Sequence, residues 1–340
     1  MTLKGTRFSS FGTKTVRRTP PWRIVGLVSV LGGLAVFVSW HPSTWVSLDL
    51  TRVAAAGAEW HAGRDPYAVG GFLYAPPMAV VGALLTPNVW VAWAAAELAM
   101  AIALAPRSVP ALLVAVTWPG VLSDVALGNV TVVLVVAAML AMRHDRLAAG
   151  VPLGVALAAA PKPMFLMLLL WLLVHRRRTF WGVAAGGASL TLAAALLLGP
   201  SLYVQFLEVI LRGVDPRFVG NSGLSYLWPL GGALAWLASA LAAILLIRRP
   251  EAGLMAAAVA GTFAGTYAGI YSTTLPLAVL PLYHHRFAKA SRYVALCGLL
   301  SWWSLWIAGA LALAVIAWSA IRDPLDGHND ALPVQTAGGP

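Results

Sequence analysis

The chain has 340 residues, of which 60% are hydrophobic and only 10% are charged, and its mean hydropathy is +0.80. A soluble domain carries about 25% charged residues and about 45–50% apolar ones, so a water-soluble fold of this size could not bury so much apolar surface. The net charge of +11 would suit a nucleic-acid-binding protein, but no basic patch is interleaved with aromatic side chains that could stack on bases. We therefore expect a polytopic protein of the lipid bilayer, with no nucleic acid as a partner.

Long windows of the sequence contain no Asp, Glu, Lys or Arg. A helix that spans a bilayer needs about 20 mostly apolar residues, and the longest windows hold a span with its flanks. Ala and Leu dominate them with Gly interspersed, as expected where helices pack closely in lipid. They predict an all-α fold, a polytopic bundle of about 10–13 transmembrane helices. The windows cover residues 24–40, 66–96, 108–123, 125–142, 179–207, 218–247 and 293–321.

Short basic clusters between the apolar runs follow the positive-inside pattern of a membrane protein. They divide the chain into a basic cytoplasmic tail over 1–23, a membrane domain over 24–320 and a polar tail over 321–340 that we expect to be disordered. If the N-terminus lies on the cytoplasmic side of the plasma membrane, outer loop one covers 41–72 and outer loop two covers 200–225. The middle of outer loop one, TRVAAAGAEWHAG, predicts a short helix that ends at a glycine and lies along the outer interface.

The number of crossings leaves one question open. Four apolar segments lie between outer loop one and Arg143, at 73–86, 88–104, 109–122 and 127–142. A chain that passes from outside to inside must cross an odd number of times. One segment must therefore re-enter, or two must merge, or Arg143 must face outward.

Ionisable residues in or at the membrane are energetically expensive, so each is a candidate functional residue. Asp49 stands at the outer end of the first span, where an apolar environment would raise its pKa and let it accept a proton from a hydroxyl. The alternative is a solvated loop aspartate. Lys162, in AAAPKPMF, could hold a phosphate, or it could be a snorkelling lysine at the interface.

Other polar and charged residues are open to more than one interpretation. Glu97 could be a packing partner, a protonated buried acid or part of a cavity. Asp124 and Asn129 could close a polar cavity between two spans, or they could cap a helix and form a turn. Arg212 and Arg217 could clamp an anion or remain solvated. No His or Cys spacing suggests a metal site, and we expect neither a metal nor a cofactor.

Several short motifs follow one another in a fixed order. After Asp49 come GRDPY at 63–67, YAPP at 74–77, LGNVTVVL at 127–134, AAAPKPMF at 158–165, HRRRTFWG at 175–182 and GNSGLSYL at 220–227. Together they resemble glycosyltransferase family 87, the polyprenyl-phosphate-mannose-dependent α-mannosyltransferases of the GT-C superfamily. The resemblance extends over residues 24–285 and is carried by the order and spacing of the motifs.

The resemblance implies a GT-C-like enzyme that moves a sugar, most often mannose, from a polyprenyl-phosphate donor to a lipid or glycan acceptor on the outer face. It implies Asp49 as the general base of a single displacement with inversion. The leaving group is already a phosphate and needs cationic stabilisation rather than a proton. For this we expect Lys162, supplemented by Arg52 or Arg64. The contacts to sugar or lipid phosphate expected by position are Asp65, Tyr67, Tyr74, Asn129, Asn221 and Ser222.

Two other functions stay open: a transporter or flippase of a lipid-linked sugar, and a structural membrane protein. A transporter should place its polar groups near the midplane on broken helices, whereas an enzyme that uses a lipid donor should gather them at one leaflet boundary. The polar residues fall in the expected outer loops, which favours the enzyme. The late segment with Ser272, Thr273 and Thr274 offers only hydroxyls, and whether it lines an acceptor pocket is left open.

Overall fold

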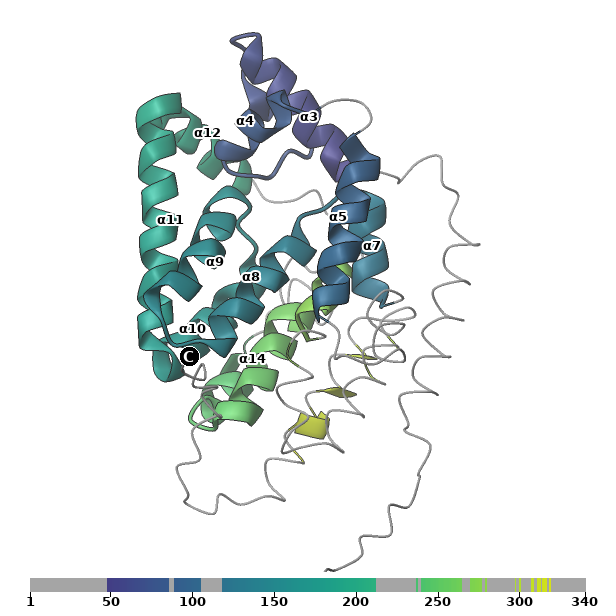
Figure 1. Cartoon of the computed structure of the whole chain (residues 1–340), viewed down its shortest axis with the longest axis vertical. Coiled ribbons are helices and arrows are strands. Elements are labelled where there is room, and N and C mark those ends of the chain that lie inside the picture. The colour runs from purple at the N-terminus through teal and green to yellow at the C-terminus, as the bar shows by residue number, and fades with distance from the viewer. Residues whose placement is uncertain are drawn as a thin grey trace, which may run out of the picture.

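All secondary structure in the part of the chain that the structure describes is helical, which confirms the predicted all-α class for these residues (Figure 1). The structure is a computed structural model and describes residues 48–85, 89–104, 118–211, 240–264 and 270–276, with single positions between 237 and 318. The α-helices are α3 (Leu48–His61), α4 (Pro77–Ala83), α5 (Val89–Leu104), α7 (Pro119–Leu127), α8 (Thr131–Arg143), α9 (Leu147–Ala159), α10 (Leu166–His175), α11 (Arg177–Leu198), α12 (Pro200–Leu211) and α14 (Pro250–Ala264). Short 3₁₀ helices are η1 (Pro66–Ala68), η2 (Pro163–Phe165) and η5 (Ile270–Thr273).

Several predicted features lie outside the described residues. They are the basic tail, the first span, the second half of outer loop two with Arg212, Arg217, Asn221 and Ser222, and the polar C-terminal tail.

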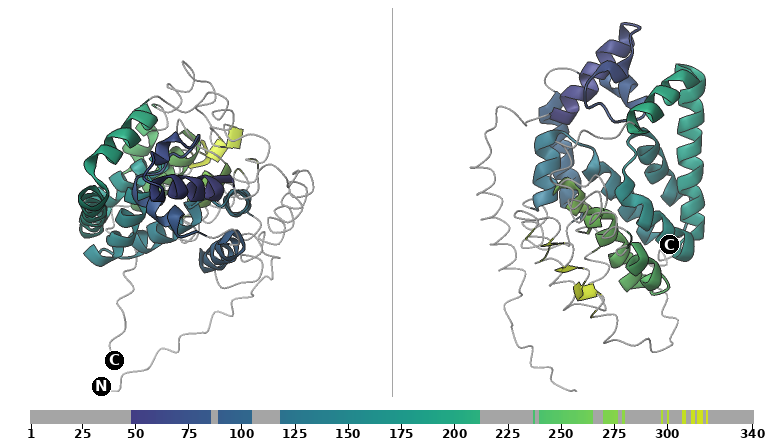
Figure 2. Two further views of the ribbon diagram at one scale, coloured as in Figure 1. Left: turned by 90° about the horizontal axis from the view of Figure 1, so that it is seen from above. Right: turned by 180° about the vertical axis from the view of Figure 1, so that it is seen from behind.

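Helix α3 is the helix predicted for outer loop one. It begins at Leu48, so that Asp49 lies in its first turn, where the helix dipole favours a carboxylate. It ends at His61, and Gly63 then takes a left-handed conformation with φ of 70°. The predicted glycine stop is confirmed. Seen from above, α3 lies across the bundle (Figure 2).

Helix α4 packs directly against α3. A Cβ atom at Gly57 would lie 2.0 Å from the backbone nitrogen of Ala83, and one at Gly82 would lie 1.9 Å from the backbone oxygen of Val53. The two backbones therefore touch, which requires glycine at both positions. The seven residues of α4 rise about 10 Å, so this apolar segment holds no helix that could cross a bilayer by itself.

Two apolar stretches of the chain, at 119–143 and 147–175, each form two helices with a break between them. The first is broken between α7 and α8, where Gly128 ends α7 in a left-handed conformation with φ of 65°. The second is broken between α9 and α10, where Lys162 stands between two prolines that cannot continue a helix. Both interruptions carry residues that the sequence marked as candidates.

Helices α9 and α11 lie in backbone contact along two glycine pairs. A Cβ atom at Gly150 would lie 2.0 Å from the carbonyl oxygen of Thr179, and one at Gly182 would lie 1.9 Å from that of Leu147. One turn further, a Cβ atom at Gly154 would lie 2.0 Å from the carbonyl oxygen of Val183. Each helix thus presents glycines four residues apart to the other, the spacing that lets helices pack closely in lipid.

The loops with basic residues gather at one end of the bundle, called here the basic end. The Asp145 carboxylate accepts from the backbone N–H groups of Arg178 and Thr179, at 3.1 and 3.3 Å. His175 contacts the carbonyl oxygen of Ile247 at 2.6 Å. The loops at 143–146, 175–179 and 247–250 therefore lie together, so Arg143 lies at the same end of the bundle as Arg176 and Arg248. Helices α3, α4 and α12 lie at the opposite end (Figure 1).

Helix α11 is the one helix among the described residues that is long and apolar enough to cross a membrane, with 22 residues and a mean hydropathy of 1.7 in its most apolar window. The other apolar helices of the described ranges are shorter, at 10 to 17 residues.

Candidate functional site

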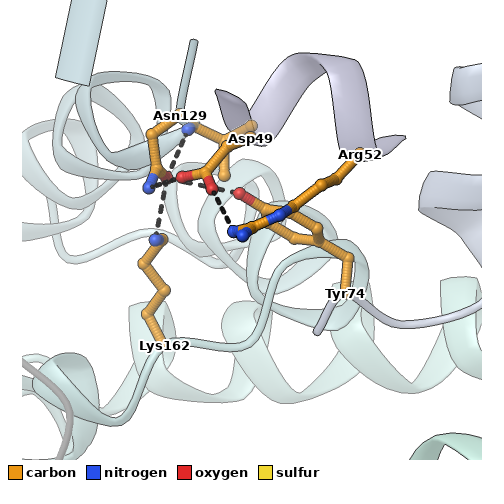
Figure 3. Close-up of polar contacts among 6 residues, drawn as sticks. Asp49, Arg52, Tyr74, Asn129 and Lys162 are labelled. Atoms are coloured by element: carbon orange, nitrogen blue, oxygen red, sulfur yellow. Dashed lines mark hydrogen bonds and ion pairs between the residues drawn. The ribbon is translucent and has the colours of Figure 1, made fainter. Parts of the chain in front are cut away.

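The candidate residues from three distant parts of the chain meet around Asn129 (Figure 3). The Asn129 side chain is only 2% exposed and lies in the break between α7 and α8. Its Nδ2 donates to Asp49 Oδ2 at 2.7 Å, and its Oδ1 accepts from Lys162 Nζ at 2.8 Å. Tyr74 Oη lies 3.5 Å from the same Oδ1. We call Asp49, Arg52, Tyr74, Asn129 and Lys162 the site cluster.

Asp49 is the carboxylate of the cluster. Its side chain is 19% exposed, and Oδ1 lies 3.5 Å from an Arg52 guanidinium nitrogen. Burial raises the pKa of the Asp49 carboxyl above its ordinary value, while Lys162, Arg52 and the Asn129 amide hold part of that rise back. Since Oδ2 is taken by Asn129 and Oδ1 has only the longer Arg52 contact among the described residues, Oδ1 has room to accept a proton.

The Arg52 guanidinium lies close to the backbone of a glycine. Gly71 has a φ of 79°, and a Cβ atom there would lie 2.7 Å from the Arg52 guanidinium carbon. Only a residue without a Cβ atom lets the guanidinium come this close to the backbone. Glycine at position 71 therefore leaves room for Arg52 beside Asp49.

Lys162 provides the second cation of the cluster. Its ammonium has one hydrogen bond, to Asn129, and lies 4.5 Å from the centre of the Tyr271 ring, a cation–π arrangement. An ammonium has three N–H donors, so among the described groups two of them have no hydrogen-bond acceptor. Lys162 itself is half-buried. Its two remaining N–H donors are the groups that could bind an anion.

Two further carboxyl groups lie beyond Lys162, inside the bundle. Asp124 and Glu97 are each 0% exposed, and both interact electrostatically with the Lys162 ammonium. Asp124 Oδ2 accepts from the backbone N–H of Val132 at 2.7 Å and so caps α8, as one of its two predicted roles required. The sequence left the roles of both residues open, because it could not show that they face Lys162.

Tyr67 and Asp65 support the cluster rather than join it. Tyr67 donates its hydroxyl to the backbone oxygen of Tyr74 at 3.1 Å. Its ring packs at a tilt against that of Phe206 of α12, with ring centres 6.1 Å apart. Asp65 accepts from the Tyr67 backbone N–H at 2.8 Å and caps η1. Outer loop one is thereby joined to α12.

Arg64 lies away from the cluster, past the other end of α3. Its guanidinium forms an ion pair with Glu59 through two nitrogens, and the Arg64 side chain is exposed. Hydrogen bonding from Arg64 lowers the pKa of Glu59. The pair explains the fold of this turn and gives Arg64 a partner other than a donor phosphate.

The late segment reaches the same region. Ser272, Thr273 and Thr274 are fully buried, and the Trp118 indole donates to the backbone oxygen of Thr273 at 2.9 Å. The Thr274 hydroxyl donates to the backbone oxygen of Tyr271 at 2.8 Å. These residues hold Tyr271 under Lys162. Sequence reasoning missed Tyr271, and the neighbouring run of hydroxyl residues was the available signal.

No group of three or more His, Cys, Asp or Glu side chains within the described ranges could hold a metal ion. Comparison with protein-family models, with curated proteins and with solved structures finds no match for this chain. The site cluster therefore has to be interpreted from its own chemistry: a carboxylate and an ammonium joined by one amide, with a guanidinium beside the carboxylate.

Proposed function

We propose that the chain is an integral membrane glycosyltransferase that moves a sugar, mannose in the first instance, from a polyprenyl-phosphate donor to a lipid or glycan acceptor. The observation that carries the proposal is the pairing of a carboxylate with room for a proton, Asp49, and an ammonium with N–H donors to spare, Lys162, across the Asn129 amide.

The packing supports a membrane location. Leu196 and Leu197 of α11 are 77% and 83% exposed, whereas on α5 the acid Glu97 is fully buried beside exposed apolar residues such as Val91. Apolar side chains outside and an acid inside is the reverse of a soluble protein, and it suits a helix whose outer face contacts lipid. The close glycine packing of α9 on α11 suits the same surroundings.

The arrangement of charges supports a site toward the outer leaflet. By the positive-inside rule the basic end faces the cytoplasm. Helix α8 runs from Asn129 to that end over 13 residues, about 20 Å. The site cluster then lies well away from the cytoplasmic side, next to α3 and the outer loop.

The proposed reaction is one displacement. An acceptor hydroxyl gives its proton to Asp49 Oδ1 while its oxygen forms a bond to the anomeric carbon of the sugar. The bond between that carbon and the phosphate oxygen breaks, and its electron pair leaves with the phosphate. Lys162, with Arg52 beside Asp49, stabilises the negative phosphate, which needs no proton to depart.

The test is transfer of radiolabelled mannose from polyprenyl-phosphate-mannose in detergent, with membrane lipid extract as the acceptor pool. Asp49→Asn should lose about 10²- to 10⁴-fold in rate, because an amide cannot take the proton. Glu59→Gln is the matched control: it neutralises another carboxylate of the same helix, in the exposed pair with Arg64, and should transfer at the wild-type rate. Normal turnover by Asp49→Asn contradicts the general-base role.

The interrupted helices favour a second candidate, a flippase or transporter of a lipid-linked sugar. Breaks such as those at Asn129 and Lys162 are typical of transporter binding sites. Movement of a labelled polyprenyl-phosphate sugar across vesicles without any new glycosidic product would favour this function. Label in a new lipid or glycan favours the enzyme.

A further inference from the structure

The amide of Asn129 stands between the two opposite charges of the site cluster. Its Nδ2 faces the Asp49 carboxylate, and its Oδ1 faces the Lys162 ammonium (Figure 3). The orientation is fixed chemically, because the backbone N–H of Val130 also donates to Oδ1 at 2.7 Å and an amide nitrogen could not accept it. Asp49 and Lys162 make no direct ion pair.

The amide cannot easily swing away. Asn129 donates its backbone N–H to the carbonyl oxygen of Asp124 at 3.0 Å, and its own carbonyl accepts from the Trp93 indole at 3.0 Å. The preceding Gly128 fixes the turn with its left-handed conformation. The Asn129 oxygen already accepts from Lys162 and Val130, so the second N–H of Nδ2 is the main hydrogen-bonding capacity that the amide has left.

We propose that Asn129 is a positioning residue that keeps Asp49 and Lys162 apart, so that the carboxylate stays available for a proton and the ammonium for an anion. The inference rests on the proposed function, in which these two residues act on acceptor and donor. Opposite charges so poorly solvated attract strongly. Without a group between them, Asp49 and Lys162 would form a direct ion pair. The carboxylate would then be less available for a proton, and the ammonium less available for an anion.

The electrostatic surroundings make the idea testable by pH. Asp49 faces Arg52 on its own helix and Lys162 and Asn129 from the two helix breaks, while Lys162 also faces Asp124 and Glu97. Closer approach of Lys162 would lower the pKa of Asp49. Loss of the Asn129 N–H alone would raise that pKa. The two effects of removing the amide therefore have opposite signs.

Two substitutions separate these effects. Asn129→Ala removes the amide and opens space, so that Lys162 and Asp49 can pair, whereas Asn129→Leu removes the polar ends but keeps the space filled. The acidic limb of the kcat/KM profile should move to lower pH by about one to three units in Asn129→Ala and should not move to lower pH in Asn129→Leu. Asn129→Ala should also lose about 100-fold in kcat/KM, with a higher KM for the donor. A shift to higher pH in both variants means that Asn129 is only a hydrogen-bond donor and overturns the proposal.

A double variant covers the case in which Asn129→Leu does not fold. Adding Lys162→Met to Asn129→Ala removes the new ion pair, so the acidic limb should return to or above its wild-type position. If the acidic limb of the double variant stays where it lies in Asn129→Ala, the proposal is contradicted. Thr131→Val is the matched control, since it changes a hydroxyl 3.4 Å from Asn129 Oδ1 and leaves the amide in place. It should keep the wild-type profile.

A readout without catalysis separates this inference from the proposed function. Infrared titration of the carboxyl C=O band, assigned to Asp49 by its absence in Asp49→Asn, reports the protonation of this group directly. The band should titrate at lower pH in Asn129→Ala than in the wild type, and an unchanged titration overturns the inference. A wild type that transfers no sugar from any lipid-phosphate donor would overturn the proposed function and leave this measurement valid.

Discussion

Helices α8 and α9 connect two ends of the bundle that handle charge in opposite ways. At the basic end, Arg143 and Arg146 are exposed, and the loops are joined by Asp145 and backbone groups. At the other end the charges of Asp49 and Lys162 turn inward and meet on one amide. The number of charges at one end of the bundle therefore does not identify a candidate site. A better indicator is a set of inward-facing charges that hydrogen-bond to one shared group, as Asp49 and Lys162 do with Asn129.

The physical difference lies in what each charge costs. An exposed arginine keeps its hydration, so its position is weakly determined and its loss changes little. A charge withdrawn from water has to be compensated by partners of fixed geometry. Such groups persist only where the surrounding fold supports them, which is why the site end is where substitutions should have specific effects.

Among the tests of this comparison, the largest effect is expected from a pair of substitutions at the two ends of α9. Lys162→Met removes the cation next to its last turn and should raise the KM for the lipid-phosphate donor about 10- to 100-fold, the loss expected for hydrogen bonds to a charged group. Arg146→Met removes a cation at its first turn, on the basic end, and should leave the donor KM unchanged. Donor titration of both variants in the transfer assay checks the comparison, and equal losses would remove the distinction between the two ends.

The next effect concerns the glycine contact that holds α9 on α11 between the two ends. Gly182→Ala places a methyl group 1.9 Å from the Leu147 carbonyl oxygen and should destabilise the fold by about 1–3 kcal/mol or more, because two backbones must separate. Gly187→Ala on the same helix meets its first neighbour at 3.3 Å and should cost much less. Thermal unfolding in detergent measures both. Equal losses would mean that α9 and α11 do not pack in this way.

A smaller effect tests whether Arg52 belongs to the site end. Gly71→Ala and Gly63→Ala both force an alanine into a left-handed conformation, with φ of 79° and 70°, and both should cost about 1–2 kcal/mol. Only the methyl group at Gly71 meets the Arg52 guanidinium, because a Cβ atom at Gly63 has no neighbour within 4 Å. Transfer should therefore fall about fivefold more in Gly71→Ala, the scale of one partly exposed ion pair. Equal rates in the two variants would exclude Arg52 from the site.

The smallest effect is a pH dependence of stability. Because the folded protein raises the pKa of Asp49 above 3.8, ionisation of this group opposes folding, and the cost grows as pH rises through the folded-state pKa. Asn at this position does not ionise. The Tm difference between Asp49→Asn and the wild type should therefore increase as pH rises through the acidic range, and it should level off above the folded-state pKa of Asp49. Below the usual carboxyl pKa the Tm difference should not depend on pH. A Tm difference that does not change with pH would show that the Asp49 pKa is not raised.

Part of the site was predictable and part was not. Asp49 and Lys162 stood out because charged residues beside apolar runs are rare and costly. Arg64 was grouped with Arg52 because both lie in outer loop one, but Arg64 pairs with exposed Glu59 and Arg52 lies against Asp49. Residues on one loop look alike in sequence, and only packing determines which of them turn inward.

The sequence by itself determined the all-α class, the helix of outer loop one with its glycine stop, and the segregation of basic residues between apolar runs. These follow from hydropathy and from conformational preferences that act over a few neighbouring residues. Only the tertiary structure decided that Asn129 joins Asp49, 80 residues away, to Lys162, 33 residues away, and that the short helix α4 turns back against α3. The reason is that hydrogen bonds between distant residues depend on how whole helices pack, and no local preference of the chain encodes that arrangement.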